Sequence, residues 1–312
     1  MSRTFWIRFA LLVFVAGVPF ALAALTPPPS PNLKEIAQRA AQELDRLLQL
    51  RAQQTFTIAA FPSIRAYAAT SPETRSQRAA IALNELQAWV ASDTHVREVV
   101  ITDEQGIVIM ATREGWNEDV SARKFVQDAL RGQLAVSPIA QDRGEFSTYY
   151  AAPILDNRKE IAGALVIRVA AQEMWSVTPR GENFYAVISD ENGVRLDDSG
   201  NPARRLTSFG PLDAPRAAQI SRAHVYGAQL PQPRATTLTR AQELVTRGAL
   251  DELTARDFDA GALAAQRLVS RPWYVLALAP APTFVDLGWR FGVPLIAAIL
   301  LAFGGALLLN RL

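Results

Sequence analysis

The stretch VITDEQGIVI at residues 100–109 has a close copy, VISDENGVRL, at residues 187–196. In each copy, β-branched residues run into Asp-Glu-x-Gly, and the glycine permits the positive φ that a tight hairpin turn requires. Each copy therefore predicts a strand, a turn and a second strand. The spacing is too long for a solenoid repeat and suits two copies of one small α/β module. The alternative is chance similarity between two common turns.

The composition of the chain excludes several classes of function. Its 312 residues suffice for one or two domains, and the formal charge is only +2. Lys and Arg are scattered, with no run longer than a pair such as Arg204-Arg205, which argues against a nucleic-acid partner. The absence of cysteine excludes disulfides, thiolate metal sites and a Cys nucleophile.

Catalytic and metal-binding patterns are weak. We find no G-x-S-x-G, P-loop or H-E-x-x-H motif, and we expect neither an enzyme nor a cofactor. Taken alone, the pairs Asp103-Glu104 and Asp190-Glu191 could indicate cation sites. Both pairs are explained by the turns in which they lie, where Asp commonly binds backbone amides. His95 and His224 lack a second ligand at helical spacing, so no metal site is expected.

Both ends of the chain carry long uncharged segments. Residues 9–25 follow Arg3 and Arg8, and residues 291–309 end just before Arg311. A bilayer is crossed by roughly 20 apolar residues in a helix, and Arg residues near such a segment favour the cytoplasmic side. Both segments therefore predict contact with a membrane.

We predict an anchor at residues 1–25 and a transmembrane helix at residues 289–310. Together they place residues 26–285 outside the cytoplasm of a bacterium, with two passes through the inner (cytoplasmic) membrane. The alternative for the first segment is a signal peptide, because Ala21-Leu22-Ala23 resembles a small-x-small cleavage site.

Residues 33–95 predict a helical stalk. A helix starts after Asn32, which begins a capping-box pattern, and apolar residues at helical spacing continue toward Ala60. Pro62 bends or ends this helix, and a second helix spans residues 71–92. The apolar stripe of the long helix either packs on its own domain or pairs with a second copy in a homodimer.

Two α+β modules follow the stalk. The first, residues 96–178, combines a hairpin, a short helix and three more strands into an antiparallel five-stranded sheet. These elements are expected at residues 96–112, 121–131, 134–139, 146–154 and 161–170. The second module, residues 184–285, repeats the hairpin and is expected to form a second five-stranded sheet. Its elements are expected at residues 184–196, 214–223, 239–255, 262–270 and 272–279.

The order of these parts resembles the double Cache domain, the tandem PAS-like extracytoplasmic sensor of bacterial membrane signalling proteins. Besides the two hairpins, the similar stretches are DVSARKF at 119–125, YYAAPI at 149–154, IAGALV at 161–166 and PWYVLA at 272–277. The resemblance covers roughly residues 33–285 and both end segments. It implies a membrane-distal module that binds a small ligand and a membrane-proximal module that relays the signal.

The resemblance also implies ligand-binding residues. An Arg-x-aromatic pair at the start of the short helix, here Arg123 and Phe125, would grip a ligand carboxylate. A guanidinium offers such a group a bidentate fork. The alternative for Arg123 is a surface ion pair with Asp119 or Asp128. Trp116 lies in the loop that would cover the pocket, or is a plain core or lid aromatic.

Three residues on the predicted distal strands complete the candidate site. Family members that bind amino acids usually carry an Asp near the end of the last distal strand, and Arg168 stands there instead. An inward-facing Arg168 would suit a second acid group, as in a dicarboxylate; the alternative is that it points outward. Tyr149 and Tyr150 point to opposite faces of one strand, so one of them should face the pocket.

Two classes of function remain open. The first is a small-molecule sensor whose ligand, a carboxylate, binds in the distal module and whose output passes through the last membrane helix. These 312 residues contain no kinase or cyclase, so the partner is separate or the chain is part of a truncated receptor. The second is a membrane-anchored scaffold or partner-binding protein, or a degenerate sensor; it predicts a pocket filled by side chains.

Overall fold

The computed structural model describes residues 31–113, 120–227, 230–232 and 238–281, together with 296, 299 and 300. The chain divides into two compact units, and everything below concerns the unit Leu33–Ala279. Over the described residues, no helix has both the length and the apolar character that a membrane crossing needs. The membrane segments predicted at 1–25 and 289–310 lie outside the described residues, apart from those three positions.

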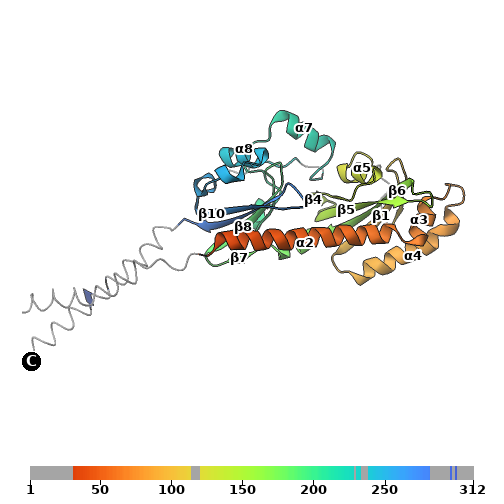
Figure 1. Ribbon diagram of the computed structural model, residues 1–312, viewed down its shortest axis with the longest axis horizontal. Helices are drawn as coiled ribbons and strands as arrows, with labels where there is room; N and C mark the ends of the chain where they lie inside the picture. Colours follow the sequence, from red (N-terminus) through yellow and green to blue (C-terminus); the bar gives the residue numbers. More distant parts are fainter. Residues whose placement is uncertain are drawn as a thin grey trace, which may run out of the picture. The chain divides into compact units, whose positions relative to one another are not determined.

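A long helix, α2 (Leu33–Ala59), packs against both sheets of this unit, touching β5 in one and β10 in the other (Figure 1). Its buried apolar residues recur at three- and four-residue spacing, and the same buried face also carries Asp45, Arg51 and Thr55. The buried apolar residues include Leu33, Ala37, Ala40, Ala41, Leu44, Leu48 and Ile58. Pro62 lies in the first turn of a new helix, α3 (Pro62–Ala68), where its missing N–H costs nothing.

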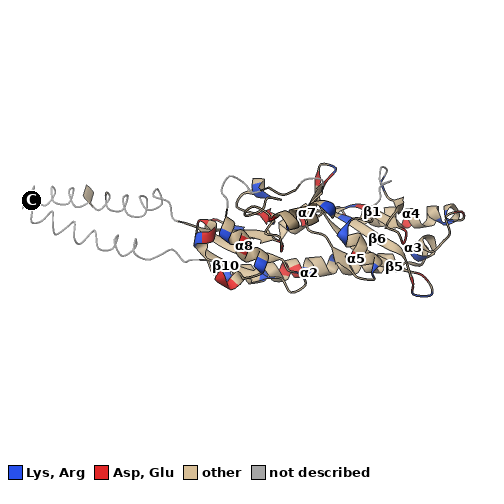
Figure 2. Cartoon of the chain, turned by 90° about the horizontal axis from the view of Figure 1, so that it is seen from above, with Lys and Arg blue, Asp and Glu red and all other residues tan. Residues whose placement is uncertain are grey.

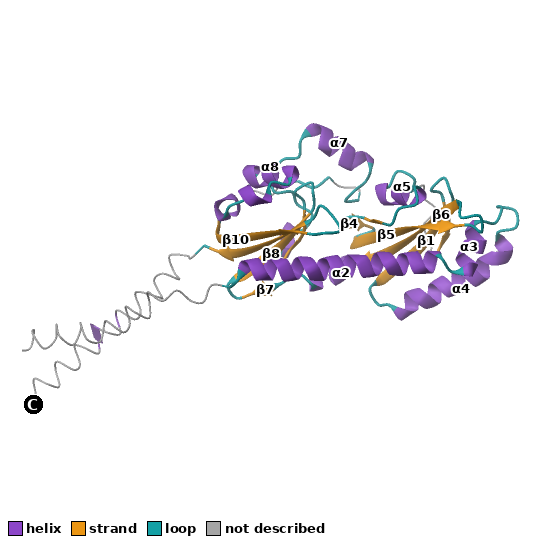
Figure 3. Cartoon of the chain, in the orientation of Figure 1, coloured by secondary structure: helices purple, strands orange, loops and turns teal. Residues whose placement is uncertain are grey.

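The second predicted helix begins later than expected. Residues 72–75 form turns, with the amides of Thr74 and Arg75 bonded to the carbonyl of Ser71, and α4 spans Ser76–Ser92. The predicted long helix, the second helix and the α+β class are confirmed. Figure 3 shows α2 and α4 on one side of the first sheet and α5 on the other.

The first sheet is antiparallel and has six strands in the order β2-β1-β6-β5-β3, with β4 also pairing with β5. The strands are β1 (Val96–Thr102), β2 (Val108–Ala111), β3 (Ala135–Val136), β4 (Ala140–Asp142), β5 (Glu145–Leu155) and β6 (Ile161–Ala170). The prediction of five strands was wrong here. Pro138 offers no amide to β5, so the strand expected at 134–139 ends at Val136 and a separate strand follows.

The second sheet has the five strands predicted, in the order β10-β11-β8-β7, with β9 pairing with β8. They are β7 (Arg180–Gly181), β8 (Phe184–Ser189), β9 (Arg195–Asp198), β10 (Ala260–Arg267) and β11 (Tyr274–Pro280). The remaining helices are α5 (Lys124–Leu130), α6 (Ala171–Ser176), α7 (Ala214–Arg222), α8 (Thr239–Arg247) and the short 3-10 turns Pro202–Arg204, Leu250–Glu252 and Ala255–Phe258. The helix predicted at 239–255 ends early because Gly248, at φ 71°, caps it in the left-handed conformation.

The repeated hairpins are the same turn at the level of hydrogen bonds. The carboxylate of Asp103 accepts the amides of Gln105 and Ile107 at 3.0 and 2.8 Å. In the second copy, Asp190 accepts the amides two and four residues onward at 3.0 and 3.1 Å. The glycines Gly106 and Gly193 have φ of 86° and 70°. The similarity of the two stretches is therefore structural.

Each sheet is buried on both faces. One continuous apolar cluster lies on the α2 side and includes Leu44, Leu48, Tyr150 and Val275. A second cluster lies between the first sheet and α5, and a third between the second sheet and α8. In the view of Figure 2, Lys and Arg residues are interspersed with Asp and Glu residues, as the scattered charges of the sequence predict.

Candidate functional site

The two tyrosines on β5 lie on opposite faces of the first sheet, as strand alternation predicts. Tyr150 packs in the cluster on the α2 side. Tyr149 lies on the α5 side, where its ring stacks on that of Phe125 with centroids 5.0 Å apart and planes 5° from parallel. Tyr149 is thus the tyrosine that shares a face with the short helix.

Arg168 on β6 faces inward, so the outward alternative was wrong. It pairs in register with Tyr149 on one side and with Glu98 on the other, and it is 1% exposed. Its Nε donates to Ser147 Oγ at 3.0 Å, and its Nη2 donates to the carbonyl of Asp142 at 2.9 Å. Residues paired across antiparallel strands share a face, so this guanidinium lies beside the Tyr149 ring.

Asp142, at the end of β4, is the residue that the sequence analysis missed. Its Oδ2 accepts the hydroxyl of Tyr149 at 2.8 Å, and its Oδ1 lies 3.4 Å from Nη2 of Arg123. The sequence signal was the turn-forming stretch Asp142-Arg143-Gly144. In the structure Arg143 and Gly144 have φ of 54° and 78° and form a tight turn, so Asp142 lies at the start of a hairpin turn. The carboxylate of Asp142 therefore contacts two of the residues that were predicted to bind the ligand, Tyr149 and Arg123.

The electrostatics of this cluster keep Tyr149 protonated. Burial raises the pKa of its hydroxyl, the charge of Asp142 raises it further, and Arg168 opposes the shift. A buried phenol that donates to a carboxylate is a fixed hydrogen-bond donor at neutral pH.

Arg123 links the distal cluster to the second module. It immediately precedes α5, and its Nη1 donates to the carbonyl of His224 at 2.8 Å, while its Nη2 reaches Asp142. Its side chain is 19% exposed. The alternative pairing with Asp128 was wrong, because Asp128 pairs with Lys124 and Arg131 instead. Trp116 and Asp119 lie outside the described residues.

The segment 224–227, which follows α7, is a second link between the modules. The amide of Gln141 on β4 donates to the carbonyl of Tyr226 at 3.1 Å, and Gln141 also forms a bridge with Gly227. A Cβ at Gly227, whose φ is 93°, would lie 2.2 Å from the carbonyl oxygen of Gln141, so only glycine fits. The hydroxyl of Tyr226 donates to Asp190 in the repeated hairpin.

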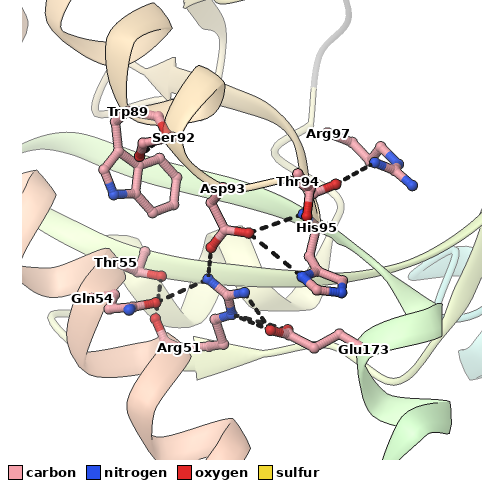
Figure 4. A network of polar contacts seen from close by, with 10 residues as sticks. All are labelled: Arg51, Gln54, Thr55, Trp89, Ser92, Asp93, Thr94, His95, Arg97 and Glu173. Atoms are coloured by element: carbon pink, nitrogen blue, oxygen red, sulfur yellow. Dashed lines mark hydrogen bonds and ion pairs between the residues drawn. The ribbon is translucent and has the colours of Figure 1, made fainter.

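A buried guanidinium fixes the long helix to the first sheet (Figure 4). Arg51 of α2 donates from Nε to both carboxylate oxygens of Glu173 on α6, at 3.0 and 2.9 Å, and from Nη1 to Asp93 between α4 and β1. The side chain of Arg51 is 7% exposed. Asp93 lies just before β1, the first strand of the sheet along the chain, and Glu173 lies just after β6, the last one. One side chain on α2 therefore binds the segments at which the chain enters and leaves the first sheet.

No group of three His, Asp or Glu side chains placed to bind a metal ion occurs among the residues that the structure describes. Asp103 and Asp190 bind backbone amides of their own turns, as predicted from turn chemistry. His95 is exposed and adjoins Asp93, and the carbonyl of His224 accepts Arg123.

The fold is that of the double Cache class of extracytoplasmic sensor domains. The sensor domain of the V. cholerae histidine kinase DctB superposes with a TM-score of 0.59 and 16% identity, over 78% of this chain and 94% of that one. The extracellular domain of vpHK1S-Z8 superposes with a TM-score of 0.51 and 15% identity, over 90% of this chain and 96% of that one. The extracellular domain of mmHK1S-Z2 superposes with a TM-score of 0.50 and 13% identity, over 79% of this chain and 95% of that one.

These likenesses define the fold. No protein-family model matches the sequence, and no curated protein matches it significantly. The recognition of a double Cache fold from the two hairpins and the stretches between them is confirmed.

Proposed function

We propose that this chain is the extracytoplasmic sensing part of a bacterial signal-transduction receptor. Its ligand is a small carboxylate bound in the distal module, on the face of β5 and β6 that α5 covers. Arg123, Tyr149 and Arg168 are the residues that hold it, with Phe125 against its apolar part. Trp116, the predicted lid residue, lies outside the described residues. Tyr150 packs on the opposite face of the sheet, and Arg168 would allow a second acid group, as in a dicarboxylate.

The observation that carries the proposal is the carboxylate of Asp142. It accepts the hydroxyl of Tyr149 and pairs with Arg123, so the candidate site already holds one carboxylate in the manner expected for a ligand. Arg168 lies on the same face, where its guanidinium pairs with Glu145 at 3.5 Å and Glu98 at 4.0 Å, while its Nη1 has no hydrogen-bond partner among the described residues. A ligand carboxylate would compete with Asp142 for these donors.

Output in this proposal passes to a separate signalling partner in the membrane or cytoplasm. Residues 26–285 lie outside the cytoplasm between two passes through the inner membrane, as their uncharged flanks suggest. A ligand shifts such a receptor only by binding its two states with different affinity. The links from Arg123 to His224 and from Gln141 to Tyr226 are the contacts in which the two states would differ.

Two observations favour the alternative of a partner-binding scaffold or degenerate sensor. The face of β5 and β6 under α5 is filled by the buried, stacked rings of Phe125 and Tyr149, as that alternative predicts. On α2, Leu50 and Phe56 are 52% and 43% exposed, whereas the other large apolar side chains of that helix are buried or half-buried. Large apolar groups that face solvent often mark a contact surface. A homodimer through α2 would cover them, and it is compatible with either function.

The test is a thermal-shift screen of mono- and dicarboxylates, amino acids, amines and purines on the full chain. Arg123→Ala is compared with Arg131→Ala, a matched change on the same helix at a side chain that is 65% exposed. A ligand at 100 times its dissociation constant stabilises by roughly 2.7 kcal/mol. We expect a carboxylate hit that disappears in Arg123→Ala and persists in Arg131→Ala. A hit that survives both changes would move the site elsewhere, and no hit on folded protein would favour the scaffold.

A further inference from the structure

A cavity of about 560 Å³ opens between the two modules, next to the cluster around Asp142. Its distal wall is formed by Lys124, Phe125 and Asp128 of α5 and by residues 134–138. The second module contributes the repeated hairpin, α7 with residues 223–225, and the β10–β11 connection. A volume of this size is typical of small-molecule sites in proteins, which are commonly lined by apolar side chains and a few convergent polar groups.

Most charges on the walls of this cavity are already paired. Lys124 and Asp128 form an ion pair with each other. Arg216 pairs with Asp213 at 3.5 Å. The charges of these side chains are therefore neutralised locally, and they should contribute little to selectivity between cationic and anionic ligands.

Two side chains of opposite charge are exceptions. Over the described residues, neither Glu191 nor Arg271 has an ion-pair partner within 4.0 Å, although each feels the other's charge across the cavity. Arg271 donates to the backbone carbonyl of Val136 at 2.7 Å, and its guanidinium lies 5.5 Å from the ring centre of Trp273. Partial burial lowers the pKa of Arg271, whereas Glu191 is exposed to solvent on the cavity wall.

The rest of the lining is apolar. Phe125 and Leu134 come from the distal module, and Ile220, Val225 and Trp273 from the second. An apolar body between two charged ends would therefore match the walls, since burial of aliphatic groups is favourable wherever polar contacts are made at the ends.

We propose that this cavity binds a small zwitterion, with its carboxylate on Arg271 and its ammonium on Glu191. The apolar body of the ligand lies against Phe125, Ile220 and Trp273. Because the walls come from both modules, an occupied cavity holds one arrangement of α5 against α7. The cavity shares Phe125 with the cluster around Asp142, and it is also lined by His224, whose carbonyl accepts Arg123. Its two charged anchors, Arg271 and Glu191, are separate from that cluster, so the proposal stands whether or not a carboxylate binds there.

Calorimetric titration of the full chain tests the proposal with ω-amino acids from glycine to 8-aminooctanoate. The alkylamine and the alkylcarboxylate of each chain length serve as probes that carry only one of the two charges. We expect at least one ω-amino acid to bind, and both single-charge analogues to bind roughly tenfold more weakly or worse.

Variants separate unpaired from paired wall charges. Glu191→Gln and Arg271→Lys should each weaken the zwitterion by roughly tenfold or more, since the first removes the charge and the second the planar fork. Asp128→Asn and Arg216→Gln, on the same walls, should change binding by less than about threefold. Arg131→Ala, at an exposed side chain of α5 that does not line the cavity, should leave this binding unchanged.

Three results would overturn the proposal. They are no binding by any ω-amino acid, equal binding by a single-charge analogue, and full binding in folded Glu191→Gln. Circular dichroism and the urea midpoint of each variant verify folding. Arg271→Lys keeps a donor for Val136, so a loss of binding in that variant does not follow from a lost structural hydrogen bond.

Discussion

Arg51 offers the sharpest test of how the long helix is held to the first sheet. Replacing it with Met keeps most of the side chain's volume and removes its charge. The change leaves the carboxylates of Glu173 and Asp93 without their cation, at side-chain exposures of 14% and 23%. Removing one partner from a buried ion pair costs about 3–5 kcal/mol because the other charge stays buried and unpaired.

The partial exposure of Asp93 puts the expected loss near the lower limit, about 3 kcal/mol of unfolding free energy. For a unit of this size that corresponds to a fall of roughly 6–12 °C in Tm. The matched control is Arg39→Met on the same helix. Arg39 pairs with Glu35 at side-chain exposures of 73% and 47%, and exposed pairs contribute about 0–1 kcal/mol.

Acid should rescue the variant. In the intact protein, burial acts to raise the pKa of Asp93, but hydrogen bonds from Arg51 and from the His95 amide outweigh it and the pKa is lowered. A lowered pKa contributes stability above the unfolded value of about 4, and that stability is lost as the pH falls through the native value. The difference between Arg51→Met and the unchanged chain should therefore shrink below pH about 4.

Urea unfolding of the full chain, followed by tryptophan fluorescence at pH 7 and pH 4, measures these differences. Adding Glu173→Gln to Arg51→Met should recover part of the loss, because one of the two unpaired charges is removed. If Arg51→Met costs less than about 1 kcal/mol at pH 7, as Arg39→Met should, then water already compensates Glu173 and Asp93. The link between α2 and the two ends of the first sheet would then not rest on this network.

Three further changes test the hairpins and the link between modules. Burial, with a contribution from the neighbouring charge of Glu191, raises the pKa of Asp190 to about 7, so the native state holds a proton that the unfolded chain releases near pH 4; stability should fall as the pH rises between these values. Asp190→Asn should remove that fall, which amounts to a difference on the order of 3 kcal/mol in the unfolding free energy measured by urea at pH 5 and pH 8; an unchanged slope would contradict the assignment. Gly227→Ala should destabilise by about 2 kcal/mol or more because its Cβ meets Gln141, whereas Gly144→Ala, with nothing within 4 Å, should cost only the positive φ, about 1 kcal/mol; equal losses in thermal unfolding would show that the Gln141 contact yields. Lys159→Gly, at φ 66° in a third turn of the same kind, should stabilise by up to about 1 kcal/mol, and a lower Tm would count against strain at that position.

Local patterns predicted the elements that depend on neighbouring residues. The Asp-x-x-Gly turns follow from hydrogen bonds within five residues, and Tyr149 and Tyr150 diverge because successive strand residues alternate. Errors arose where one residue changes a boundary. Pro138 divides a predicted strand into β3 and β4, and Gly248 ends α8 well before residue 255.

The polar contacts of the site depend on residues far apart in the sequence. Arg123 contacts His224 across 101 positions, and Arg51 contacts Glu173 across 122. Hydrophobic periodicity carries no information about such pairs, because a charged residue on a helix or strand looks the same whether its partner is water or a distant carboxylate. Arg168 was placed by its strand but not by its face, since the run from Ile161 to Ala170 is apolar on both sides of the sheet.

Contacts of Asp142 and its neighbour Gln141 connect the distal cluster to the second module. The side chain of Asp142 holds Arg123 and Tyr149, its carbonyl holds Arg168, and the preceding residue, Gln141, holds the segment after α7. A ligand carboxylate that took Arg123 and Tyr149 would free β4 at the residue next to its bond with Tyr226. Tyr226 in turn donates to Asp190 in the repeated hairpin, so a change at β4 reaches the turn that orders β8 and β9 through two side chains and one backbone hydrogen bond. Such a route transmits occupancy only if the carboxylate binds more tightly to the state in which β4 is free, because equal affinity for both states shifts nothing.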